Sequence, residues 1–452
     1  MGGDIGEDMC GDMVVAVFAE LDRLVPDGAS GVCTVGVAAS GGGDSTALLV
    51  IAERWARVRG RALAAATVDH GLRAESAEEA AGVAALCVRL KIPHQTLRTG
   101  DLRGAGGNLA AAAREARFAL LGDWARGQGL SAVLLGHTLD DQAETVLMRL
   151  ARGSGTEGLS AMQPALRRSG MLWLRPLLGV RREALRGVLR AERIDWVEDP
   201  TNDDAGYDRV KARQALAVLV PLGIDAEGLA RTAWHLQRQR RVLERAMDDL
   251  ASRARCVGAL GEVRLDLAAM AEDEPDTALR LLADTLVRIS GAAYRPRFRA
   301  LSAILGGMLS GTGAAAALSG CLIRCAEGVA LICREPDACE AMQPLQQGEM
   351  VWDRRWRVTT TGAWPATAGL GALGEHGLAA LRAGADSGNW SAPESWASAP
   401  RLVRLTAPAI WHGDGADSPE LLAAPLAGYL DQPKIGAGCA VSAENIGAGE
   451  LP

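Results

Sequence analysis

The first residues with evident chemical potential form a glycine-rich turn, Ser40-Gly41-Gly42-Gly43-Asp44-Ser45. Glycines let successive backbone N–H groups converge on one anion, and a helix that begins after the turn adds its positive end. The hydroxyls of Ser40 and Ser45 supply two further donors. Asp44 would repel a phosphate unless a cation such as Mg2+ lay between them. The turn therefore predicts a phosphate site with a magnesium ion.

A second group of polar residues lies on two expected helices. Asp141 and Glu144 are three residues apart and share a face, where they could hold a metal or an ammonium group or take a proton. An ordinary acidic first helical turn would look the same. Arg114 and Arg117 could meet a phosphate, but solvated arginines would have the same spacing. The residues alone leave these alternatives open.

Short apolar runs alternate with segments of helical spacing over the first part of the chain. Strands are expected at 31–39, 61–68, 94–98 and 131–136, and helices at 46–58, 76–90, 108–127 and 140–150. This alternation predicts an α/β fold, a Rossmann-like parallel sheet with helices on both faces. Ligands of such sheets bind beyond the carboxyl ends of the strands, where the strand order reverses. The Ser40–Ser45 turn, Asp69-His70 and the 140–150 helix all begin at such ends.

The alternation stops after about Pro221. One or two arginine-rich helices are expected at 224–250, two strands around a turn at 327–328, a strand at 351–361 and a loop at 381–400. We therefore expect an N-terminal extension and helix (1–30), the α/β domain (31–220), a helical, arginine-rich segment (221–320) and a small strand-rich region (321–452).

The charge balance gives mixed signals about a nucleic-acid partner. A net charge of −7 argues against one, because phosphate-binding surfaces are usually basic. Local stretches differ: residues 167–193 hold eight arginines and two acids, and residues 231–255 hold seven arginines and three acids. They could form a basic face or two solvated helix surfaces.

The composition excludes several classes of protein. No run of about 18 apolar residues and no basic N-terminal start are present, so we expect a cytoplasmic protein with no membrane contact. The nine cysteines include no Cys-x-x-Cys pair, which disfavours a disulfide framework or a zinc ribbon. No Walker loop occurs, and the G-x-G-x-x-G at 153–158 follows a helix where a dinucleotide site needs a strand.

The turn after the first strand resembles the Ser-Gly-Gly-x-Asp-Ser signature of the ATP pyrophosphatase, or PP-loop, enzymes, which cleave ATP between its α and β phosphates. Further motifs in the same order resemble the tRNA(Ile)-lysidine synthetases. They cover residues 68–76, Asn108-Leu109 with 113–118, then 136–145, 152–159, 199–202 and 207–209. The resemblance extends over about residues 32 to 213.

The resemblance implies a two-step reaction on the wobble cytidine of the isoleucine tRNA with a CAU anticodon. ATP adenylates the C2 oxygen of the base, and free L-lysine then displaces AMP to form lysidine. The implied ATP-binding residues are Ser40, Gly41, Gly42, Gly43, Asp44 and Ser45 for the phosphates, with Asp44 near Mg2+, and Asp69 and His70 for the nucleoside. The implied catalytic residues are Asp44, Asp141, Glu144, Arg114, Arg117 and Arg209.

One motif departs from the family. Tyr-x-Arg-Asn-Arg-x-Arg is common there, whereas Arg209 is followed here by Val210-Lys211-Ala212-Arg213. We therefore expect Arg209 to keep its role and Lys211 to be less important. The helices beyond Pro221 are candidates for gripping the tRNA, and a homodimer is compatible with the sequence.

Other functions share the turn. A PP-loop tRNA thiolase would usually need paired cysteines, and a small-molecule amidating ligase resembling NAD or GMP synthetase is a more distant match. A non-catalytic nucleotide-binding protein would need neither Asp44 nor the pair formed by Asp141 and Glu144.

Overall fold

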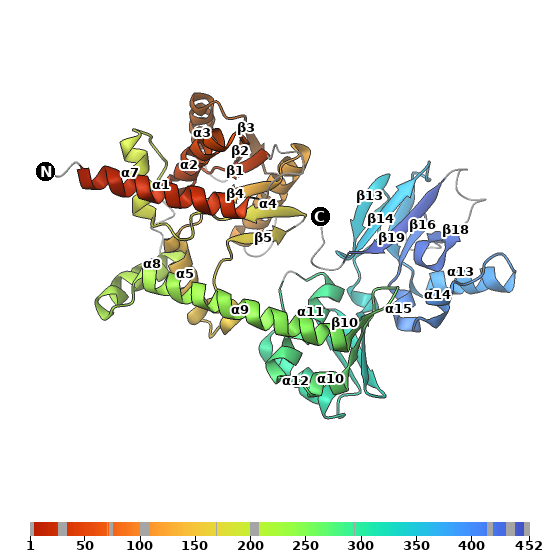
Figure 1. Ribbon diagram of the computed structural model, residues 1–452. Coiled ribbons are helices and arrows are strands. Elements are labelled where there is room, and N and C mark those ends of the chain that lie inside the picture. The colour runs from red at the N-terminus through yellow and green to blue at the C-terminus, as the bar shows by residue number, and fades with distance from the viewer. Residues whose placement is uncertain are drawn as a thin grey trace. The chain divides into compact units, whose positions relative to one another are not determined.

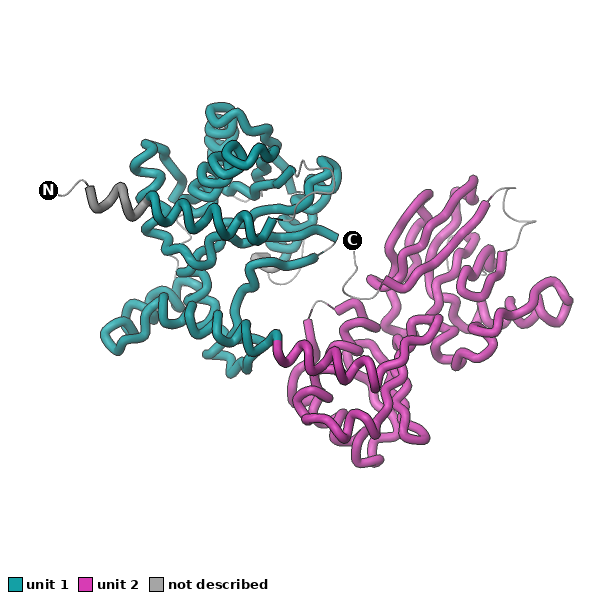
Figure 2. Tube along the Cα trace, in the orientation of Figure 1, with its two compact units in different colours: residues 1–241 teal, residues 242–452 magenta. Residues whose placement is uncertain are grey.

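The computed structural model describes residues 4–25, 34–69, 71, 76–99, 109–168, 170–198, 208–292, 294–413, 419–430 and 439–446. The chain divides into two compact units, residues 1–241 and 242–452 (Figure 2). The division falls within one long helix, α9 (Ala226–Ala254). A single helix thus covers the arginine-rich segment where one or two were expected.

A six-stranded sheet forms the centre of the first unit (Figure 1). Its order is β3 (His94–Arg98), β2 (Ala62–Asp69), β1 (Thr34–Ala38), β4 (Ala132–Leu135), β6 (Met171–Leu174) and β5 (Ala165–Arg168). All neighbouring strands are parallel except β5 and β6. The parallel α/β sheet is confirmed. The antiparallel edge strand β5 was not expected, because it is exposed and carries Arg167 and Arg168.

Helices cover both faces of this sheet. Leu48, Leu49, Ile51 and Trp55 of α2 are fully buried in a core shared with α1 and α7. On the other face, Phe118 of α4 meets the Trp173 ring edge-on, with 4.7 Å between ring centroids. The helices are α1 (Asp4–Leu24), α2 (Gly43–Arg59), α3 (Ser76–Leu90), α4 (Leu109–Gly127), α5 (Leu139–Leu150), α6 (Thr156–Leu159), α7 (Arg182–Ala191) and α8 (Asp208–Leu219).

The second unit is rich in antiparallel strands, as expected for the C-terminal region. One sheet comprises β7 (Arg255–Val257), β8 (Val263–Asp266), β11 (Val329–Arg334), β10 (Cys321–Ala326) and β9 (Ala315–Leu318), packed with α10 (Leu267–Ala271), α11 (Pro275–Ser290) and α12 (Phe298–Leu309). A second comprises β12 (Gln343–Pro344), β15 (Ala368–Ala372), β16 (Pro408–His412), β17 (Glu420–Ala424) and β18 (Tyr429–Leu430). A third comprises β13 (Gly348–Trp352), β14 (Trp356–Thr361) and β19 (Ala440–Asn445). No helix among the described residues is long and apolar enough to cross a membrane.

The single strand expected at 351–361 is wrong, because a hairpin turn interrupts it. Asp353 and Arg354 have φ values of 50° and 53°, in the left-handed region that a tight hairpin requires. Asp353 is fully buried and accepts hydrogen bonds from Arg334 at 2.9 Å and Arg355 at 2.7 Å. The buried ion pairs hold a turn that lacks the usual Asn-Gly signal.

The loop expected at 381–400 is also largely wrong. Helix α13 (Gly374–Asp386) extends into it, α14 (Glu394–Ser398) lies inside it, and α15 (Arg401–Leu405) follows directly. Trp396, 2% exposed, anchors α14 in a local apolar core. Tertiary packing therefore stabilises short helices that the Ser-, Gly- and Pro-rich sequence disfavours.

The strand order reverses between β1 and β4, and the backbone is tightly packed at that point. A Cβ on Gly136, just after β4, would lie 3.0 Å from both the Cα and the backbone nitrogen of Ser45. The end of β4 thus sets the position of the first turn of α2. Both contacts are with backbone atoms, which cannot move aside as a flexible side chain could.

Gly136→Ala is expected to lower the free energy of unfolding by about 1–3 kcal/mol, as overpacking does in other cores. Gly127→Ala is the control, because nothing lies within 4 Å of its Cβ position. Urea unfolding of both variants measures the effect. Equal stability of Gly136→Ala and the unsubstituted chain would contradict the close contact.

Candidate active site

The Ser40–Ser45 turn lies at the carboxyl end of β1 and leads into α2. Gly41 has a φ of +86°, which favours glycine, and Gly42 precedes the helix without any side-chain cap. The Ser40 N–H donates to Ser45 Oγ at 3.1 Å, and Ser45 Oγ donates to the Gly42 carbonyl at 3.0 Å. These bonds hold the loop, and the uncapped helix end offers backbone N–H groups to an anion.

The segment after α7 supports the turn from the side. The Val197 N–H donates to the Gly41 carbonyl at 3.0 Å. Trp196 packs its ring over Gly43, where a Cβ would come within 3.2 Å of Trp196 Cδ1. A Cβ at the third glycine of the turn would therefore press on the indole, which would have to shift by a few tenths of an ångström.

Arg182, the first residue of α7, joins three acidic side chains. Its Nε donates to Asp44 Oδ2 at 2.8 Å and its Nη2 donates to Asp141 Oδ1 at 3.3 Å. Its Nη1 lies 3.7 Å from Glu144 Oε1. The structure thus brings Asp44 of the glycine turn together with the carboxylate pair of α5.

Helix α5 holds Asp141 in a fixed orientation. Thr138 and Asp141 form a capping box: the Thr138 N–H donates to Asp141 Oδ2 at 2.8 Å, and the Asp141 N–H donates to Thr138 Oγ1 at 3.3 Å. The backbone N–H of Arg182 donates to Asp140 Oδ2 at 2.7 Å, which attaches α7 to the same helix end. Asp141 therefore both completes the capping box and presents a carboxylate to the site.

Helix α8 adds two arginines to the same cluster. Arg213 Nε donates to Glu144 Oε1 at 3.0 Å, and Arg209 Nη1 lies 3.9 Å from Asp141 Oδ1. These arginines are four residues apart and share a helical face. Lys211 is exposed and lies 3.9 Å from Asp208. Of the two residues that depart from the family motif, Lys211 thus lies near Asp208 rather than near Asp141 or Glu144, and Val210 is a buried apolar residue of α8.

The three carboxyl groups differ in their electrostatics. Burial opposes ionisation of Asp141, but Arg182, the Thr138 N–H and Arg209 outweigh it and lower the pKa of Asp141. Burial raises the pKa of Asp44, and Arg182 offsets this only in part. Burial and the charge of Asp141 raise the pKa of Glu144. Asp44 Oδ1 and Glu144 Oε2 are buried without a hydrogen-bond partner, so both oxygens can accept a further cation or donor.

A metal held by protein ligands alone is not built into this site. Within the described part of the chain, no group of three or more His, Cys, Asp or Glu residues is arranged to hold a metal ion. Arg182 already occupies the positive position among the carboxylates. A metal here would take Asp44 Oδ1 and complete its coordination with other oxygen ligands.

Arg175, which follows β6, and Arg114 and Arg117 of α4 form a group that we call the cationic rim. His137, which follows β4, lies beside it. Burial lowers the pKa of His137 to about 3, so its imidazole is neutral at physiological pH. Arg175 is 5% exposed, and burial followed by the charge of Arg114 lowers its pKa to about 10. Burial and Arg114 also lower the pKa of Arg117. Arg114 and Arg117 therefore share one positive field with Arg175.

Of the two residues predicted to contact the nucleoside, the structure describes Asp69, on the strand next to β1. Asp69 ends β2, the neighbour of β1, and its Oδ1 accepts hydrogen bonds from the Gly71 N–H at 2.9 Å and Ser76 Oγ at 2.7 Å. The carboxylate thus shapes the start of α3. His70 lies outside the described residues.

Sequence reasoning missed the residue that assembles the site. Arg182 was one of eight arginines in a basic stretch, and Arg213 was recognised only through its place in a motif. The signal in the sequence was a missing positive charge. Three acidic residues expected at one edge of the sheet can be buried together only if a cationic side chain lies among them. An Arg at the start of a helix that follows β6 could satisfy that need.

Arg182→Gln is expected to lower the free energy of unfolding at pH 7 by about 3 kcal/mol, because it leaves three carboxylates without their shared cation. Asp141 has a lowered pKa in the folded protein, so its ion pair stabilises the fold above the unfolded pKa and is lost as the pH falls through the folded value. The difference between the two proteins should therefore shrink below about pH 4.

Arg190→Gln provides the control on the same helix, since Arg190 is exposed and pairs with exposed Glu183. Its effect should stay within about 0.5 kcal/mol. Urea unfolding from about pH 2 to 7.5 measures both variants, so that the range passes through the lowered pKa of Asp141. A pH-independent effect of Arg182→Gln would refute its role as the shared cation.

The comparisons with known proteins agree with this geometry. Residues 15–219 match a family model described as PP-loop domain. A tRNA(Ile)-lysidine synthase from Ruegeria pomeroyi is 42% identical over 397 residues, which are 88% of this chain and 89% of the relative. A second relative, from Hyphomonas neptunium, is 38% identical over 69% of this chain and 83% of its own length. A third, from Bradyrhizobium diazoefficiens, is 49% identical over 46% of this chain and 58% of its own length.

Among solved structures, a U34-tRNA thiolase from Methanococcus maripaludis is similar with a TM-score of 0.45 and 15% identity, covering 52% of this chain and 79% of that chain. This likeness is too low to bear on function. The relatives from Ruegeria and Hyphomonas match across most of their own lengths. The chain belongs to the tRNA(Ile)-lysidine synthase family.

Proposed function

We propose that this chain converts the wobble cytidine of the CAU-anticodon isoleucine tRNA into lysidine. The C2 oxygen of the base first attacks the α-phosphorus of ATP, and pyrophosphate leaves. One amine of free lysine then forms a C–N bond at C2, the bond from C2 to the AMP oxygen breaks, and the amine gives up a proton. The observation that carries the proposal is the meeting of the glycine turn with Asp141 and Glu144 at Arg182.

The ATP phosphates are assigned to the Ser40–Ser45 turn. The uncapped start of α2 supplies N–H donors, and the hydroxyl of Ser40 lies at the exposed rim. Magnesium usually binds one or two carboxylates together with substrate phosphates, and the unpartnered Oδ1 of Asp44 fits that role. The ion would neutralise phosphate charge. Asp69, the last residue of β2, and His70, the next residue in the sequence, are assigned to the nucleoside.

The lysine step is assigned to the carboxylate pair. Asp141 is kept ionised by Arg182 and Arg209, so it can hold an ammonium group. Glu144 has a raised pKa and an unpartnered buried oxygen, the properties of a proton acceptor for the attacking amine. Arg114 and Arg117 belong to the cationic rim and are assigned to the phosphate of the adenylate.

The tRNA is assigned in part to basic and aromatic surface in residues 221–320. Tyr294 is 83% exposed and Phe298 70% exposed, and Arg297 and Arg299 lie in the same short stretch. Exposed aromatic rings interleaved with arginines are typical of RNA-binding surfaces. A local basic surface of this kind explains how an acidic protein binds RNA.

The rival functions have less support. Within the described residues no Cys, His, Asp or Glu group could hold a metal cluster of the kind a thiolase uses, and burial raises the pKa of four of the cysteine thiols to about 11 or 12. Thiols with such high pKa values are poor sulfur nucleophiles. The carboxylate pair beside the turn is not needed by a protein that only binds a nucleotide.

Purified protein is expected to transfer labelled lysine to the CAU-anticodon isoleucine tRNA when ATP and Mg2+ are present. One AMP and one pyrophosphate should form for each lysine, because adenylation supplies the leaving group. A tRNA whose wobble cytidine is replaced by uridine is the matched control. Absence of label from the RNA, with tRNA binding intact, would overturn the proposed reaction.

Glu144→Gln and Asp44→Ala should separate the two steps. Without its proton acceptor, Glu144→Gln should release pyrophosphate in a single turnover but transfer lysine about 10²-fold more slowly or worse. Asp44→Ala should lose pyrophosphate release itself. Rapid-quench assays follow both products, and Glu183→Gln on exposed α7 surface is the control. Equal slowing of both steps by Glu144→Gln would remove it from the lysine step.

A further inference from the structure

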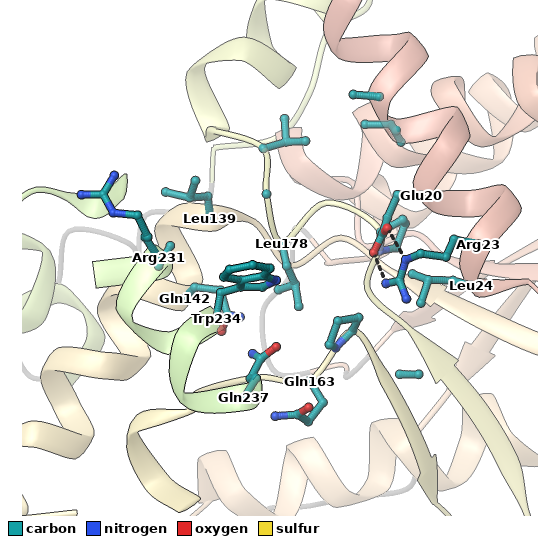
Figure 3. Close-up of a pocket in the computed structure, with 18 of the residues that line it drawn as sticks. Glu20, Arg23, Leu24, Leu139, Gln142, Gln163, Leu178, Arg231, Trp234 and Gln237 are labelled. Atoms are coloured by element: carbon teal, nitrogen blue, oxygen red, sulfur yellow. Dashed lines mark hydrogen bonds and ion pairs between the residues drawn. The ribbon is translucent and has the colours of Figure 1, made fainter. Parts of the chain in front are cut away.

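A pocket of about 780 Å3 lies beside α5 (Figure 3). Leu139 and Gln142 line it, and they share one helical face. Asp141 and Glu144 lie on roughly the opposite face and contact α7 and α8. One helix thus separates the candidate active site from a second cavity, a distance of about 10–12 Å.

The walls of the pocket come from α1, α9 and the 176–180 loop. Val17 and Val180 give it apolar surface. On one side, the amides of Gln142 and Gln237 both donate to the Met162 carbonyl at 2.9 Å, which fixes the two helices that carry them. The volume falls within the ~300–1,000 Å3 range of small-molecule sites. The pocket is therefore large enough for one nucleotide.

An aromatic ring forms part of the pocket surface. Trp234 of α9 lines the pocket and is 50% exposed. Figure 3 shows its indole beside Leu178, with Arg231 on one side and the ion pair of Glu20 and Arg23 on the other. The guanidinium of Arg238 lies 4.9 Å from the ring centroid. Exposed tryptophan surface of this kind suits a planar partner.

The charged residues of the pocket leave a positive excess. Glu20 accepts from Arg23 at 2.7 and 2.6 Å, and Glu227 accepts from Arg181 at 2.6 Å, so both acids are neutralised. In the described parts of the chain, no ion pair involves Arg231 or Arg241. Both arginines lie on the same face of α9 as Trp234. An aromatic ring between two unpaired arginines matches a base flanked by phosphates.

An unsatisfied donor completes the pocket. Gln163 Nε2 is buried and has no hydrogen-bond partner. The Gln163 carbonyl accepts from Arg175 at 2.7 Å, so the backbone at this position is fixed. A buried donor without a partner in the protein can be satisfied by an acceptor of a bound molecule. The carbonyl oxygens and ring nitrogens of a nucleobase are such acceptors.

We infer that this pocket binds one unstacked nucleotide of a single-stranded RNA loop. The base stacks on Trp234 and accepts from Gln163, and the adjoining phosphates meet Arg231 and Arg241. Loops are recognised in this way because their bases can leave the stack. The identity of the loop rests on the proposed function: with the wobble cytidine on the carboxylate side of α5, the pocket on its other side takes a different nucleotide of the same anticodon loop.

Trp234→Ala and Trp234→Phe test the stacking. Each is titrated with the CAU anticodon stem-loop and with a series of stem-loops that carry one abasic nucleotide at each loop position. Trp234→Ala should weaken binding about 5- to 150-fold, the equivalent of ~1–3 kcal/mol, whereas Trp234→Phe should stay within a few-fold of the unsubstituted chain. One abasic RNA should bind the unsubstituted chain weakly and show no further loss with Trp234→Ala.

Val242→Ala is the matched control, since Val242 is 64% exposed on α9 and does not line the pocket. It should bind every RNA normally. Arg231→Ala should reduce the salt dependence of binding by about one phosphate contact. Thermal unfolding confirms that each variant folds.

The outcomes separate this inference from the proposed function. If Trp234→Ala binds every RNA as tightly as the unsubstituted chain, or loses the same factor on every abasic RNA, the nucleotide pocket is overturned while lysine transfer still supports the function. If lysine transfer fails but one abasic position remains coupled to Trp234, the pocket stands and the function falls. Failure to bind any RNA overturns both.

Discussion

The ion pairs of Arg182 determine the geometry of the whole candidate site. Three carboxyl groups from two helices cannot be buried side by side in their charged forms without a cation among them. Arg182 provides that cation from the first residue of α7, and its backbone N–H also bonds to Asp140. Leu185 and Leu189 are fully buried and fix α7 in the core that it shares with α2. The apolar core therefore sets the positions of the polar groups.

The site is electrostatically incomplete without its substrates. Arg182 satisfies one oxygen of Asp44 and Arg213 one oxygen of Glu144, yet each carboxyl group keeps a second oxygen that is buried and unpartnered. Such oxygens carry a desolvation cost that a bound cation or ammonium group can offset. The protein thus stores part of the driving force for binding in its folded state.

The sequence alone was sufficient to predict the elements that follow from a local pattern of apolar residues and glycines. The first four strands, the Ser40–Ser45 turn and the helical face shared by Asp141 and Glu144 follow from apolar periodicity and glycine content, and the structure places them as expected. Arg182 could not be selected from its neighbours, because only the docking of α7 decides which arginine points inward. The turn at Asp353-Arg354 was missed for a similar reason, since buried ion pairs rather than turn residues hold it.

The close contact between Gly43 and Trp196 links two positions more than 150 residues apart in the chain. A Cβ at position 43 would press on the half-buried indole, which would have to shift by a few tenths of an ångström or be replaced by a smaller residue. The constraint runs in one direction, because a smaller residue at position 196 leaves Gly43 in place. The indole therefore limits the size of the third residue of the phosphate turn.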